Sequence, residues 1–145
     1  MNLKSIKKYD EKSSVFIFNL RNKFYVRKNS LDKKIIKFED HTRWLKKFFK
    51  KKNYIYLVVN NKKLIGYIRL ELKRNIHNVS WALEKENHGK GIIKKFLQKA
   101  TNNKNVKYKA IIKKNNLASI SVAYHAKFEL KLIRNQICYL YKNIY

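Results

Sequence analysis

The sequence predicts a single-domain α/β fold in which a mixed, mostly antiparallel sheet is flanked by helices. Three observations lead to this fold class. Apolar residues alternate with small or polar ones over Val79–Leu83, which is the period of a strand. The apolar residues of Ile92–Ala100 recur at helical spacing, with lysines outside the apolar face. Strand-like and helix-like segments follow one another with no linker or repeat, so we expect one domain over residues 1–145.

The first part of the chain contains one strand signal and two helix signals. Residues 2–8 are expected to form a short strand. Asp10–Leu20 is expected to form a helix with Ser13 and Ser14 as candidate N-caps, although four consecutive apolar residues within it also suit a strand. Phe38–Lys50 is expected to form a helix, because its acidic first turn and basic last turn both match the helix dipole.

The remaining segments complete a sheet. Tyr54–Val59 and Leu64–Leu72 flank a turn-like stretch and predict an antiparallel hairpin, and Val106–Lys113 is a further strand. Two final segments predict a terminal hairpin, Glu129–Arg134 and Gln136–Tyr141.

Asn116 is placed to cap a helix that follows the Val106–Lys113 strand. The apolar face expected for this helix consists of Leu117, Ile120, Tyr124 and Phe128.

The chain is extremely basic, since 36 Lys and Arg residues against 9 Asp and Glu residues give a net charge of +27. One interpretation is a polyanionic partner, such as nucleic acid, an acidic membrane or a phosphorylated small molecule. The other is compositional drift, because lysine, asparagine and isoleucine are abundant throughout and proline is absent. The lysines are spread along the chain rather than gathered in one tail, and no nucleic-acid-binding motif is present.

Several classes of protein are disfavoured by what the sequence contains. No apolar run has the length of a membrane span, and no signal-peptide pattern follows the first lysines. The single cysteine, Cys138, excludes an internal disulfide and favours a cytoplasmic location. His77, His88 and His125 do not have the spacing of metal ligands, so we expect no metal.

Two of the three glycines lie in one turn, His88-Gly89-Lys90-Gly91-Ile92-Ile93, between a strand and a helix. A glycine turn at a helix start lets backbone N–H groups converge on an anion, and the helix dipole adds to the attraction. The turn lacks the Gly-Lys-Ser/Thr of a P-loop and the third glycine of a dinucleotide-binding loop.

This turn resembles motif A of the GNAT family of N-acetyltransferases, Arg/Gln-x-x-Gly-x-Gly/Ala, with His88 and Ile93 as departures. A second stretch, residues 116–128, resembles the family pattern Asn-x-x-Ser-Ile-x-x-Tyr/Phe-x-x-x-Gly-Phe at its Asn, Ser, Ile and Phe positions. Ala123 and Lys127 depart from it. With the order of elements, the resemblance covers essentially the whole chain and implies a GNAT fold with splayed central strands.

The resemblance implies acetyl-CoA as co-substrate. The pyrophosphate would lie over the backbone N–H groups of residues 88–93, with a lysine such as Lys90 or Lys94 near the 3′-phosphate. Asn116 would contact the pantetheine arm, and the N–H of Leu83 would stabilise the oxyanion. The expected cofactor-binding residues are Leu83, His88, Gly89, Lys90, Gly91, Ile92, Ile93, Lys94, Asn116 and Ser119.

Short motifs in the first third resemble acetyltransferases of nucleotide-linked amino sugars, a branch that includes the pseudaminic acid pathway and surface polysaccharide biosynthesis. These motifs are Leu20-Arg21-Asn22, Val26-Arg27-Lys28-Asn29-Ser30 and His41-x-x-Trp44-Leu45. They imply a nucleotide-linked amino sugar as acceptor, in a monomer or homodimer. The expected substrate-binding residues are Arg21, Asn22, Arg27 and Trp44.

An amine that attacks a thioester must be neutral, and the departing thiolate needs a proton. Glu71 and His41 are the candidate bases. The alternative interpretation is that Glu71 is a solvent-facing strand residue and that His41 packs its helix against the core. Tyr124 is the candidate acid, although it lies one residue from the aromatic position of the family pattern.

Two alternatives remain open on the sequence alone. One is a protein or peptide N-acetyltransferase of the same fold, and the other is a basic nucleic-acid-binding module.

Overall fold

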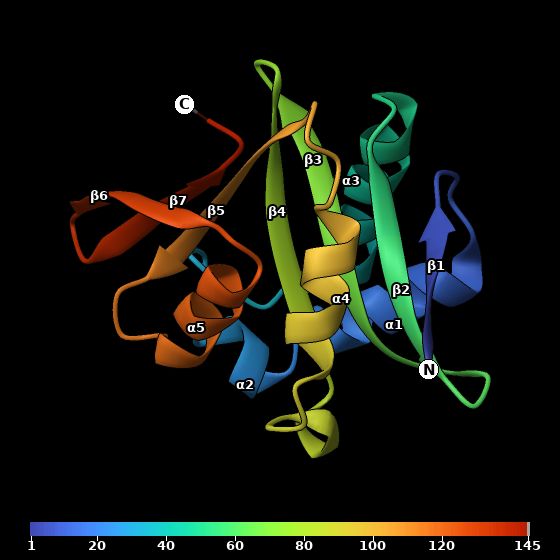
Figure 1. The fold of residues 1–145 in the computed structure, drawn as a ribbon. Helices are drawn as coiled ribbons and strands as arrows, with labels where there is room; N and C mark the ends of the chain where they lie inside the picture. Colours follow the sequence, from blue (N-terminus) through green and yellow to red (C-terminus); the bar gives the residue numbers. More distant parts are fainter. Residues whose placement is uncertain (145) are drawn as a thin grey trace.

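The computed structural model describes residues 1–144, and its centre is a seven-stranded sheet (Figure 1). All neighbouring strands pair antiparallel except β4 and β5, which are parallel, so the predicted mixed, mostly antiparallel sheet is confirmed. In spatial order the strands are β1 (Asn2–Ile6), β2 (Tyr54–Asn60), β3 (Lys63–Lys73), β4 (Ile76–Leu83), β5 (Lys107–Lys113), β7 (Ile137–Lys142) and β6 (Glu129–Arg134).

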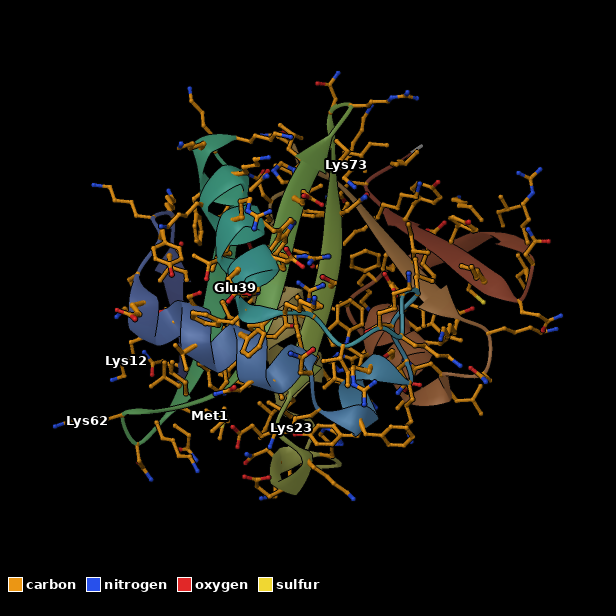
Figure 2. The ribbon with its side chains drawn as sticks, turned by 180° about the vertical axis from the view of Figure 1, so that it is seen from behind. Met1, Lys12, Lys23, Glu39, Lys62 and Lys73 are labelled. Carbon is orange, nitrogen blue, oxygen red and sulfur yellow. The ribbon has the colours of Figure 1, made fainter. Side chains whose placement is uncertain are left out.

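Helices cover both faces of the sheet, as Figures 1 and 2 show from opposite sides. One face carries α1 (Glu11–Arg21), α2 (Phe24–Arg27) and α3 (Phe38–Lys50), and the other carries α4 (Ile92–Ala100) and α5 (Leu117–His125). A short 3₁₀ helix, η1 (Lys85–Asn87), follows β4. No helix in residues 1–144 combines the length and apolar character needed to cross a membrane.

Each face of the sheet has its own apolar core, because successive strand residues point to opposite sides. On β3, Ile68 and Leu70 pack toward α4, whereas Tyr67 packs toward α1 and α3. The helices supply matching faces, with Phe96 and Leu97 of α4 in the first core and Leu45 of α3 in the second. These two layers hold the sheet between them.

The α1 helix forms nearly where it was expected, but its cap differs from the prediction. Asp10, not Ser13 or Ser14, is the N-cap, and its carboxylate accepts a hydrogen bond from the Ser13 N–H at 3.1 Å. Both serines are buried inside the helix. The helix prevails over a strand because Ile17 and Leu20, three residues apart, then reach the core together.

The α5 helix begins at the expected cap but presents a different face. Asn116 Oδ1 accepts a hydrogen bond from the Ser119 N–H at 3.3 Å. The predicted apolar face is correct for Ile120 and Phe128, which pack in the core, but wrong for Leu117 and Tyr124, which are 74% and 48% exposed. Ala123 is fully buried instead, so a small side chain lets the helix pack closely on the core.

The β4 and β5 strands pair over only three residues, Ile76–Asn78 with Lys107–Lys109. Beyond this pairing the strands diverge, and α5 lies toward the open end (Figure 1). β4 stays paired with β3 as far as Leu83, and β5 pairs on its other edge with β7. The predicted splay of the central strands is therefore present.

Candidate functional site

A cleft of about 800 Å³ opens where β4 and β5 separate. Its walls come from the turn after β4, from α5, and from β3 and β4 on the α1 side of the sheet. The remaining lining comes from the end of α1, from α2 and the connection that follows it, from the start of α4 and from β5. The cleft therefore joins the glycine turn to the N-terminal third of the chain.

The glycine turn has the backbone of an anion-binding loop. Gly89 has φ 75° and Gly91 has φ 73°, in the left-handed region that favours glycine. Within residues 1–144, the N–H groups of Gly89, Lys90 and Gly91 donate to no protein acceptor. The first N–H groups of α4 add to them, because a helix start leaves them without intrahelical partners. The side chain of Ile93 is buried in the core, so this departure from the family motif leaves the backbone donors free.

The backbone N–H of His88 is not among these donors, contrary to expectation, because it bonds the Lys85 carbonyl at 3.0 Å. The side chain of His88 braces the turn instead. Its Nε2 lies 2.7 Å from the Leu83 carbonyl, and its ring meets Tyr25 edge-on at 5.6 Å. Lys94 lines the cleft, whereas Lys90 is exposed and outside its lining.

The α5 wall contributes both of its predicted polar residues, Asn116 and Ser119. The cap bond uses Asn116 Oδ1, which leaves its Nδ2 group available to a ligand. Val122 lines the cleft as well, but Tyr124 does not, because two residues rotate the helix surface by about 200°. Tyr124 is therefore not positioned to protonate a thiolate in this cleft.

Residues 28–37 form a strap that crosses β3 and β4 between α2 and α3 (Figure 2). Side chains outside the strap hold its backbone. Asn22 donates to the Ile36 carbonyl and accepts from the Ile36 N–H, both at 2.9 Å. Arg27 donates to the Lys33 carbonyl at 3.1 Å. Asn22 and Arg27 are thus engaged with the strap and do not line the cleft, which corrects their expected contact with substrate.

Two arginines line the cleft, and both contact the ring of Trp44. The Cζ atoms of Arg21 and Arg69 lie 5.0 and 5.2 Å from the ring centroid. Arg21 was expected here, whereas Arg69 was not. Trp44 itself does not line the cleft, so its expected role as a substrate contact is replaced by support of the two guanidinium groups.

Glu71 lines the cleft on the same face of β3 as Arg69, opposite Asn78 of β4. Its carboxylate lies 3.5 Å from Lys73 Nζ, and 21% of its side chain is exposed. It is therefore accessible to an amine or to a water molecule.

His41 lies in the core on α3 and does not line the cleft. It is only 1% exposed, and its Nε2 is 3.0 Å from the Ser14 carbonyl. Burial lowers its pKa from 6.5 to about 4. This buried, neutral imidazole packs helices and cannot reach an acceptor amine.

Tyr67 and Arg69 are among the cleft residues that sequence reasoning did not assign to the site. The period of a strand would have found them, because Tyr67, Arg69 and Glu71 are alternate residues that share one face of β3. No three His, Cys, Asp or Glu side chains gather as a metal site in the described part of the chain.

A family model described as an acetyltransferase (GNAT) domain matches residues 11–129. No curated protein sequence gives a significant match. Solved structures resemble the chain over nearly its whole length, and three of them illustrate the range.

Ribosomal-protein-alanine N-acetyltransferase from Brucella melitensis has a TM-score of 0.79 at 15% identity, covering 98% of this chain and 99% of that one. Spermidine N-acetyltransferase from Vibrio cholerae, in complex with CoA and spermine, has a TM-score of 0.79 at 16% sequence identity. The match covers 97% of this chain and 94% of that one. Phosphinothricin acetyltransferase from Sinorhizobium meliloti, in complex with acetyl-CoA, has a TM-score of 0.78 at 14% sequence identity. The match covers 98% of this chain and 88% of that one. At such identities these likenesses show the fold.

The neutral His41 predicts a loss of stability in acid. The unfolded chain binds a proton at this residue below its ordinary pKa of 6.5, whereas the folded chain does so only near pH 4. The free energy of unfolding should therefore fall by roughly 3 kcal/mol between about pH 7 and pH 4 through this residue. Urea unfolding across this range should show a smaller loss for His41→Gln, and no such change for the exposed His125→Gln. Equal acid losses in His41→Gln and the parent would contradict this account.

Proposed function

Because the chain belongs to the GNAT acetyltransferase family, we propose that it transfers the acetyl group of acetyl-CoA to the amine of a nucleotide-linked amino sugar. The family makes the protein an acetyl-CoA-dependent N-acetyltransferase. The acceptor, the roles of individual residues and a place in surface polysaccharide biosynthesis are the proposal. So is a cytoplasmic location, which the free, buried Cys138 favours.

One observation supports this proposal above the others: a single cleft connects the anion-binding turn with the two arginines. Acetyl-CoA enters at the turn, where the N–H groups from Gly89 to Lys94 meet its pyrophosphate. Its arm then follows the open edge of β4 and passes Asn116 and Ser119. The thioester reaches Leu83, and the acceptor approaches from the strap side.

The chemistry requires a neutral amine next to the thioester carbonyl. Glu71 takes the proton from the acceptor amine, directly or through one water molecule. The N–H of Leu83 stabilises the negative charge that develops on the carbonyl oxygen. The amine then forms the amide bond as the carbon–sulfur bond breaks. The proton that Glu71 accepted passes through water to the departing thiolate, so that CoA leaves as the thiol.

The charge of the cleft supports an anionic acceptor. Five basic residues line it, Arg21, Arg69, Lys73, Lys94 and Lys109, against two acidic ones, Asp32 and Glu71. A polyamine or a basic peptide would meet repulsion there, whereas a nucleotide diphosphate would be attracted. The strap crosses β3 and β4 (Figure 2), and its residues 29–32 line the cleft, so they can restrict the acceptors that fit.

The turn predicts a strong effect of negative charge at Gly91. Asn and Asp both tolerate the left-handed backbone, so Gly91→Asn tests shape and Gly91→Asp adds only charge. Calorimetry should show acetyl-CoA binding at least about tenfold weaker for Gly91→Asp than for Gly91→Asn. Gln98→Glu, on the exposed side of α4, should bind like the parent. Equal affinities of the two Gly91 variants would remove the turn from the donor site.

Glu71→Gln keeps the size of the side chain but removes the base. We expect kcat/KM to fall about 10²- to 10⁴-fold with acetyl-CoA binding unchanged. Glu39→Gln, an exposed change on α3, should leave kcat/KM and the affinity for acetyl-CoA unaltered. A kcat/KM of Glu71→Gln equal to that of the parent would exclude Glu71 from the mechanism.

The acceptor is tested by measuring thiol release with four panels of amines. These are nucleotide-linked 4-amino sugars, the same sugars without the nucleotide, polyamines and N-terminal peptides. We expect the highest kcat/KM with the nucleotide-linked sugars, because only they combine an amine with a diphosphate. Turnover of peptides and of no sugar nucleotide would overturn the proposal in favour of a protein N-acetyltransferase.

A further inference from the structure

We propose that Arg21 and Arg69, held against Trp44, form a subsite that binds the diphosphate of the acceptor. The inference rests on the proposed function and assigns its specificity to two named side chains. Arg21 is the last residue of α1, and Arg69 lies in the middle of β3, so two separate elements bring the guanidinium groups to one ring. Their Cζ atoms lie 5.0 and 5.2 Å from the Trp44 centroid.

Neither arginine has the partner that a partly buried cation normally has. Within residues 1–144, neither forms an ion pair or donates a side-chain hydrogen bond. By contrast, Arg27 nearby donates to two backbone carbonyls, Asn22 at 3.0 Å and Lys33 at 3.1 Å. The five N–H donors of each guanidinium are therefore free to serve a ligand in the cleft.

The two positive charges also oppose each other. Burial lowers the pKa of Arg21, and the charge of Arg69 lowers it further, while Tyr67 and Asp32 act in the opposite direction. Placing two like charges together in a partly buried site costs free energy unless an anion compensates them. Both charges line an open cleft, where a bound anion would offset the unfavourable free energy of their repulsion.

Guanidinium chemistry favours a phosphate-type anion. Each guanidinium can bind two oxygens at once, and its contact with the Trp44 ring uses none of its N–H donors for a protein hydrogen bond. Arg69 and Glu71 are alternate residues of β3 on the same face, so they lie about 7 Å apart. A sugar held by its diphosphate at Arg69 can thus present its amine to Glu71.

The test measures binding of UDP to the protein saturated with CoA, so that UDP cannot occupy the donor turn. Arg21→Gln and Arg69→Gln should each weaken UDP binding about tenfold or more, since hydrogen bonds to charged groups are lost. Arg43→Gln is the matched control, because it removes one guanidinium from an exposed position on α3 outside the cleft. In turnover, the KM for the nucleotide-linked sugar should rise in Arg21→Gln and in Arg69→Gln, whereas Arg43→Gln should keep the KM of the parent.

Arg21→Lys and Arg69→Lys provide a second route if a glutamine variant fails to fold, since each keeps a cation against Trp44. They should bind UDP more weakly than the parent because the bidentate contact is lost. UDP affinities equal to that of Arg43→Gln would overturn the subsite, as would absence of UDP binding to the CoA-saturated parent. If UDP binding depends on both arginines but no sugar nucleotide is acetylated, the subsite stands and the proposed acceptor falls.

Discussion

The short pairing of β4 with β5 is the constraint on which the site depends. Each strand keeps one partnered edge, β4 with β3 and β5 with β7, while the facing edges separate after Asn78 and Lys109. Unpaired backbone groups on such edges need hydrogen-bond partners, and a ligand arm that carries amide groups can supply them. The turn after β4 and the two arginines line the same cleft at this separation. In the proposed reaction, the donor and the acceptor meet in this cleft.

The large positive charge does little to hold this fold together. Only three ion pairs occur among residues 1–144, and such pairs at a protein surface contribute at most about 1 kcal/mol each. The two apolar cores supply the stability, so surface positions can accumulate lysine without loss of structure. Surface lysines of that kind are compatible with compositional drift. Arg21 and Arg69 differ from them, because they are partly buried and contact an aromatic ring.

The sequence predicted the strands, the long helices and the glycine turn because each has a local signal of period, cap or glycine. It predicted contacts across the chain less well. Asn22, Arg27 and Trp44 were expected to contact the substrate, but their partners are a strap backbone and two guanidinium groups that no local pattern reveals. The α2 helix was missed, since its four residues show no period. Tyr124 was misplaced because the packing of Ala123 fixes the rotation of α5.

The strap is held almost entirely through its main chain. Asn22 binds the N–H and carbonyl of Ile36, Arg27 binds the carbonyl of Lys33, and Lys113 binds the carbonyl of Lys28. Any residue except proline at position 36 can offer the same groups. Mutations in the strap can thus alter the side chains that face an acceptor without changing the path of the loop. Selectivity can therefore evolve on this segment separately from folding and from donor binding.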